Sequence, residues 1–252
     1  MKSIARAALA ATFALAAAFG VAAQTATQST TPKTSEITVE QAYLQGAIEA
    51  LIIDEQARAS EVDPWKNRET KRMALAYIKQ AIDGGRKSES IRNSLEFLAL
   101  ETTRVIVRSG GVGKPTNNYP DIRAAACDYL AQFPSTRTKD ALVKVVLSDD
   151  EPMVLSAAIR SLGKLGINEG DEVTQDIAFI VNRYDILFPD NSLAFEALIA
   201  FERIADKNKG IKDPAAYTAI RRIAGGNYIS PVKSRASTLM EKLLKYQAES
   251  GK

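Results

Sequence analysis

Histidine is absent from the 252 residues of this chain. Histidine is the commonest general base of enzymes, a member of the Ser-His-Asp and Cys-His arrangements, and the commonest zinc ligand. Its absence therefore excludes the most frequent forms of hydrolytic and zinc-dependent catalysis. Catalysis by carboxylates alone remains open, and no cofactor is predicted.

Cysteine occurs once, at Cys127, so the chain cannot form an intramolecular disulfide. Cys127 follows three alanines, and we expect it to be a small buried hydrophobic residue rather than a reactive thiol. Without a disulfide the protein must be stabilised by its core alone, and roughly 215 structured residues are enough to form one.

The chain also has no large excess of positive or negative charge. The chain has 33 Lys and Arg against 30 Asp and Glu, a formal net charge of +3, and the two signs are interspersed. Loss of Lys2 and Arg6 with an N-terminal leader would lower this charge to +1. Such a balance gives no general attraction to polyanions, so we predict no nucleic-acid partner.

The N-terminus has the pattern of a signal peptide. Lys2 and Arg6 precede an apolar run over 7–21 that is short for a membrane-spanning helix. The run ends in small residues, so we predict cleavage after Ala23 and a periplasmic or secreted protein without stable membrane insertion. The alternative is a leader that is retained as a membrane anchor.

The rest of the chain is predicted to be one helical domain over 36–248, preceded by a disordered polar linker over 24–35 and followed by a short tail over 249–252. Apolar residues recur at helical spacing, and Gly, Pro, Asp or Asn separates the segments. The spacing predicts an all-α protein with ten helices, over 38–59, 64–83, 88–108, 119–132, 136–148, 152–165, 171–188, 191–207, 213–224 and 230–247.

Proline and glycine mark the expected helix ends. Asp213-Pro214 and Ser230-Pro231 pair a capping side chain with a proline in the first turn, where its missing N–H would have no partner. Glycines at 84–85, 166, 210 and 225–226 stand where a left-handed residue would end a helix.

Every second helix follows one template, in which a small alanine has apolar residues near four positions before and after it. The clearest copy runs from Pro120 to Ala126 with Leu130, and another runs from Pro152 to Ala158 with Leu162. Such alanines let two helices approach closely. The aligned alanines of the five copies are Ala74, Ala126, Ala158, Ala197 and Ala236.

The copy from Pro120 to Ala126 resembles the Pro-x-Val-Arg-x-x-Ala pattern of HEAT repeats, and the resemblance extends over about 64–247. It implies a right-handed α-solenoid of about five antiparallel helix pairs, with the second helices lining the concave face. It also implies that Arg123 pairs within the ladder between repeats. Leu155 and Ala194 stand where the family often has this arginine.

A partner-binding surface is expected on the outward side of the second helices. Its predicted residues are Asp128, Arg160, Lys164, Arg203 and Glu241, and Trp65 could anchor a partner from its helix start. The alternatives are a merely solvated face and a Trp65 that packs the end of the array.

Two other motifs do not indicate ligand sites. Ser109–Pro115 resembles a phosphate-binding loop but lacks its first glycine and its Ser/Thr, so 109–118 is read as an inter-helix loop that a partner could use. The acidic runs 149–151 and 170–172 lack the ligand spacing of a calcium loop and favour helix capping, so no metal site is predicted.

The leading functional hypothesis is therefore a non-enzymatic protein-binding scaffold or adaptor of the bacterial cell envelope. One alternative is a HEAT-like enzyme or small-ligand carrier, either related to the lyases that handle bilin pigments or using paired carboxylates as glycosidases do. Another is a self-assembling structural envelope protein. The partner's identity is not encoded in any recognisable motif.

Overall fold

The computed structural model of this protein describes residues 46, 52–57, 64–101 and 117–250. The chain divides into a unit of residues Met1–Thr38 and a unit of residues Val39–Lys252, and all the described residues belong to the second. The predicted leader and linker, the glycine-rich segment 109–115 and most of the first predicted helix lie outside the described residues.

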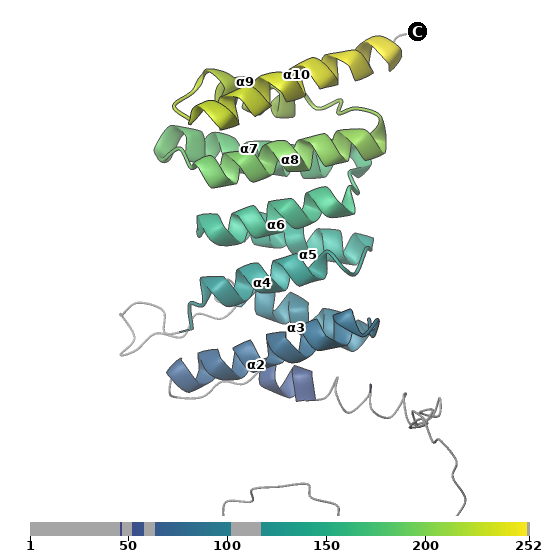
Figure 1. Ribbon diagram of the computed structural model, residues 1–252, viewed down its shortest axis with the longest axis vertical. Coiled ribbons are helices and arrows are strands. Elements are labelled where there is room, and N and C mark those ends of the chain that lie inside the picture. Colours follow the sequence, from purple (N-terminus) through teal and green to yellow (C-terminus); the bar gives the residue numbers. More distant parts are fainter. Residues whose placement is uncertain (1–45, 47–51, 58–63, 102–116, 251–252) are drawn as a thin grey trace, which may run out of the picture. The chain divides into compact units, whose positions relative to one another are not determined.

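The described part of the second unit is built of helices, as Figure 1 shows, and contains no strand. The all-α prediction is confirmed. The helices are α2 (Pro64–Asp83), α3 (Glu89–Ala99), α4 (Pro120–Leu130), α5 (Thr136–Ser148), α6 (Pro152–Leu165), the short 3-10 helix η2 (Glu169–Asp171), α7 (Glu172–Leu187), α8 (Asn191–Asn208), α9 (Pro214–Gly225) and α10 (Ser230–Ser250).

Local capping explains why several boundaries agree with the sequence prediction. Asp213 accepts hydrogen bonds from the backbone N–H groups of Ala215 and Ala216 at 3.0 and 3.2 Å, and Pro214 takes the first position of α9. Two otherwise unpaired amides are thereby satisfied, and proline forfeits no hydrogen bond there. The same logic places Pro152 at the start of α6, whose bounds match the prediction.

The end of α9 differs from the prediction. Gly226 is extended, with φ −85° and ψ −170°, and not left-handed. Packing requires a glycine at this position, because a Cβ on residue 226 would lie 2.6 Å from the carbonyl oxygen of Arg222 and 3.1 Å from the ring of Tyr228. Ser230 is also the first residue of α10 rather than the cap before it.

The helices form two rows. Helices α2, α4, α6, α8 and α10, here called the even-helix row, contact one another in chain order, and α3, α5, α7 and α9 form the odd-helix row in the same way. Figure 1 shows the rows stacked from α2 to α10. All five copies of the sequence template fall in the even-helix row. The repeat in the sequence therefore corresponds to one layer of an α-solenoid.

The aligned alanines lie where neighbouring helices meet, and all five are fully buried. A glycine permits the close approach of α6 to the backbone of α8, where a Cβ on Gly163 would lie 2.7 Å from the Cα of Ala200. Large side chains fill the space beside the alanines, so Leu162 and Phe201 are also fully buried. Small residues thus set the helix spacing, and larger ones fill the core.

Candidate protein-binding faces

A buried ion pair joins α4 to the turn before α6. Arg123 Nε donates to Asp149 Oδ2 at 2.6 Å, and Arg123 Nη1 donates to Asn118 Oδ1 at 2.7 Å. Asp149 Oδ1 also accepts from the backbone N–H of Glu151 at 2.9 Å, so the same carboxylate holds the turn. Arg123 therefore pairs inside the array, as the resemblance to HEAT repeats implied.

A second buried pair joins α2 to the end of α3. Lys71 Nζ lies 3.2 Å from Glu101 Oε1 and donates to the carbonyl oxygen of Ala57 at 2.8 Å. Burial lowers the pKa of Lys71 and raises that of Glu101, and the attraction between the two opposes both shifts. The pair anchors the described part of the first helix to α2.

Sequence reasoning missed Lys71, although the template contains the signal. Lys71 stands three residues before Ala74, as Arg123 stands three residues before Ala126. Leu155 and Ala194 occupy this position in the next two copies and are buried. In these four copies the position therefore points into the array, and a charge placed there must find a buried partner, whereas Lys233 at this position of the fifth copy is partly exposed.

Cys127 is fully buried. Burial, followed by the nearby carboxylates of Asp149 and Asp128, raises the pKa of its thiol. The thiolate is thus disfavoured, and the prediction of a small buried hydrophobic residue is confirmed.

The outward side of the even-helix row, here called the even-helix face, carries the predicted contact residues. Arg160 Nη1 donates to both carboxylate oxygens of Asp128 at 2.9 and 3.0 Å, and Arg160 Nε lies 3.0 Å from Glu196. Burial alone would lower the pKa of Arg160, but the two carboxylates outweigh it and raise that pKa. Arg160 thus bridges α4, α6 and α8.

Lys164 and Arg203 differ from Arg160. Lys164 lies one turn beyond Arg160 on α6, Arg203 lies two turns beyond Glu196 on α8, and both are exposed. Neither forms an ion pair with a carboxylate of the described residues. Glu241 is also exposed, on α10, and the side chain of Trp65 lies outside what the structure describes. Among the predicted charged contact residues, those that form no ion pair with a described residue are therefore Lys164, Arg203 and Glu241.

Further along this face, ion pairs fix α8 to α10. Glu202 accepts from Arg235 at 2.5 Å and from Lys242 at 3.1 Å, and Lys242 also lies 2.6 Å from Asp206. The guanidinium of Arg235 lies 5.5 Å from the ring centre of Phe195. Most charges here already have partners in the chain.

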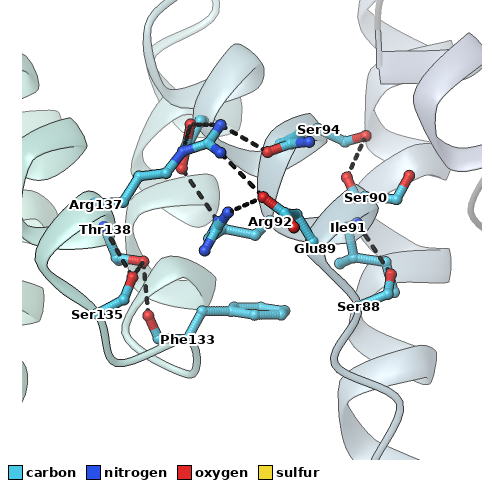
Figure 2. A network of polar contacts seen from close by, with 12 residues as sticks. Ser88, Glu89, Ser90, Ile91, Arg92, Ser94, Phe133, Ser135, Arg137 and Thr138 are labelled. Atoms are coloured by element: carbon cyan, nitrogen blue, oxygen red, sulfur yellow. Dashed lines mark hydrogen bonds and ion pairs between the residues drawn. The ribbon is translucent and has the colours of Figure 1, made fainter.

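The outward side of the odd-helix row, here called the odd-helix face, is cross-linked in the same way. Figure 2 shows Arg137 of α5 reaching across to α3. Its guanidinium donates to Glu89 at 3.2 Å, to Asn93 at 2.8 Å and to Glu96 at 3.0 Å. Lys139 of α5 pairs with Glu172 of α7.

The second acidic run does not provide the hydrogen-bonded cap of α7. The backbone N–H of Thr174 donates to Asn168 Oδ1 at 3.1 Å, and the side chain of Asp171 caps no amide. Within the described ranges, no group of three His, Cys, Asp or Glu side chains could hold a metal ion. Of the helices described, none combines the length and the apolar character needed to cross a membrane.

Residues 116–181, from the start of α4 to within α7, match the family model of HEAT repeats. This part of the chain contains HEAT repeats. HEAT repeats generally mediate protein interactions and are typically non-enzymatic. No curated protein and no solved structure matches the chain.

Proposed function

We propose that this HEAT-repeat protein is a non-enzymatic scaffold of the bacterial cell envelope that binds another protein through its even-helix face. The single observation that carries the proposal is the contrast between Arg160 and its two neighbours. Arg160 is held between Asp128 and Glu196, whereas Lys164 and Arg203 point their charges to solvent from adjacent helices. A rigid ladder therefore presents two available cations to a partner.

Exposed apolar side chains on the same row support this proposal. Met153 begins the outward stripe of α6, and Phe195 lies in the first turns of α8. An interface needs apolar contact for affinity and charge for register and specificity. The even-helix face offers both, so its expected partner is a protein surface with carboxylates opposite Lys164 and Arg203.

The test is affinity capture from an envelope extract, using the chain from Gln24 as bait. The variant Lys164→Glu/Arg203→Glu reverses the two available cations. The matched control, Lys209→Glu/Lys212→Glu, makes the same change of net charge at exposed positions in the turn between α8 and α9. We expect one protein to be captured by the wild type and the control and lost with the variant. Equal capture by all three baits, or no capture by any, would contradict the proposal.

The envelope location rests on the predicted leader and has its own test. We expect the exported form to begin at Gln24, because Val21 and Ala23 supply the small residues that signal peptidase accommodates. N-terminal sequencing of the protein from a periplasmic fraction checks this. A chain that still carries residues 1–23 in the membrane fraction would support the retained anchor instead.

A further inference from the structure

Four large apolar side chains are exposed near the end of α5, in the middle and last turn of α7, and directly after α7. The exposed fraction is 50% for Leu147, 61% for Phe179, 73% for Ile186 and 79% for Phe188. These residues, here called the α5–α7 patch, belong to the odd-helix row. Large exposed apolar patches on soluble proteins mark interaction sites.

The helix register brings the patch together. Lys139 pairs with Glu172, and Arg183 donates to Asp150 at 2.9 Å; each pair joins residues 33 positions apart. Each residue of α5 therefore lies about level with the residue of α7 that stands 33 positions later in the chain. This register sets Leu147 level with residue 180, which is one position from Phe179 along α7. On α7, Phe179, Arg183 and Ile186 follow one another at helical spacing and share one face.

Cations border the patch. Lys144 lies one turn before Leu147, and Arg222 of α9 donates to Asn182 of α7 at 3.4 Å, beside the stripe that carries Phe179. Arg221 is its exposed neighbour. None of these three cations forms an ion pair within the described part of the chain, whereas the nearby carboxylate of Asp150 already pairs with Arg183. Asp176, one turn before Phe179, also forms no ion pair within the described residues, so the available cations outnumber the available carboxylates beside the stripe that carries Phe179.

We propose that the α5–α7 patch docks an amphipathic acidic segment of a partner protein, with its apolar side chains against Phe179 and Phe188 and its carboxylates beside Lys144, Arg221 and Arg222. This surface is separate from the even-helix face and does not depend on the function proposed for it. A helical segment fits because the exposed stripe runs along α7.

The charges favour a protein segment over two other occupants. A second copy of the chain would bring the same cations against each other, which disfavours self-association through the patch. A flat anionic bilayer would bring its headgroups against Asp176 as well as against the cations, which disfavours a membrane surface as the occupant. An acidic peptide can instead place its carboxylates at the cations alone.

The test uses fluorescein-labelled peptides of about five helical turns. One peptide carries Leu and Phe on one face and Glu on the others; a second replaces Glu by Lys, and a third scrambles the acidic sequence. Fluorescence anisotropy measures their binding to the chain from Gln24. We expect the acidic amphipathic peptide to bind at least about tenfold more tightly than the other two, and less tightly as salt rises.

Three variants locate the site. Phe179→Ser/Phe188→Ser and Arg221→Glu/Arg222→Glu should each weaken binding by at least about tenfold, because one removes the apolar anchors and the other reverses the charge. Lys164→Glu/Arg203→Glu should bind like the wild type, so a failure here is distinct from a failure of the proposed function. Circular dichroism confirms that each variant is folded.

Four outcomes would overturn the inference. The first is equal binding of the Lys and Glu peptides, and the second is no binding of either. The third is sedimentation as a dimer that Phe179→Ser/Phe188→Ser converts to a monomer, which would make a second copy the occupant. The last is patch-dependent binding to phosphatidylglycerol vesicles without binding of the acidic peptide.

Discussion

Two adjacent aspartates in the turn before α6 each pair with an arginine, one pair buried and the other exposed. Asp149 is buried and holds buried Arg123 at 2.6 Å, whereas Asp150 is exposed and holds exposed Arg183 at 2.9 Å. Removing one partner of a buried pair leaves a charge that water cannot reach. Removing one partner of an exposed pair leaves a charge that water solvates. The same chemical change should therefore have very different effects at these neighbouring positions.

The substitution Asp149→Asn is expected to lower the free energy of unfolding by about 3 kcal/mol, because Arg123 keeps its charge and loses its counter-ion. Asp150→Asn, the matched control, should change it by less than about 0.5 kcal/mol. Urea unfolding followed by circular dichroism at neutral pH measures both. Similar losses in the two variants would show that burial does not set the strength of the Arg123–Asp149 pair.

The Lys71–Glu101 pair predicts a pH dependence. Burial lowers the pKa of Lys71 from its usual 10.5, and Glu101 opposes that shift. In Glu101→Gln the opposition is lost, so the pKa of Lys71 falls further. Between that lowered pKa and 10.5 the unfolded chain binds more protons than the folded one, so the stability contribution of Lys71 increases with pH.

We therefore expect Glu101→Gln to be destabilised at neutral pH and to recover part of the loss by about pH 9.5, as measured by urea unfolding relative to the wild type. The double variant Lys71→Met/Glu101→Gln should lack this recovery, because no buried amine remains to lose its proton. A loss in Glu101→Gln that stays constant or increases with pH would contradict the assignment to Lys71.

Individual helices were predictable from the sequence where their ends are set locally. Helix α6 begins at Pro152 and is followed by Gly166, whose φ of +61° is left-handed, and both signals are read from single residues. The contacts of Arg160 were not predictable. Asp128 lies 32 positions away, and which turn of α4 meets which turn of α6 depends on packing across the whole interface.

The α6–α8 interface is expected to reverse the usual effect of a glycine-to-alanine substitution on helix stability. Replacing glycine by alanine inside a helix normally increases stability. At Gly163, however, the new Cβ would lie 2.7 Å from the Cα of Ala200, so the two helices would have to separate. We expect Gly163→Ala to lower the free energy of unfolding by about 1–3 kcal/mol.

Gly225 is the matched control for Gly163. It lies in the last turn of α9, and a Cβ there would meet nothing within 4 Å. Gly225→Ala should therefore leave stability unchanged or increase it by up to about 1 kcal/mol. Thermal and urea unfolding of both variants give the comparison. A stabilising Gly163→Ala would show that the helices can separate at little cost.

For the molecule as a whole, α10 is the last helix of the described stack. The outward residues of α10 include Ser237, Thr238, Glu241 and Lys245, with Leu244 as an exposed apolar exception. The two hydroxyl groups donate to backbone oxygens of their own helix. Solenoids need such a polar terminal face to remain soluble, since an apolar one would accept another repeat. This face disfavours growth of an assembly from the C-terminal end.

Two substitutions on this face of α10 are expected to cause self-association. In Thr238→Leu/Glu241→Leu, the two new side chains would join Leu244 at helical spacing and form an apolar stripe along α10. We expect the wild type to sediment as a monomer and this variant to dimerise with increasing concentration, because the stripe is buried only by a second copy. Thr238→Ser/Glu241→Gln keeps the face polar and should remain monomeric. A wild type that already assembles, and still does so after Phe179→Ser/Phe188→Ser, would favour the structural envelope protein over the scaffold.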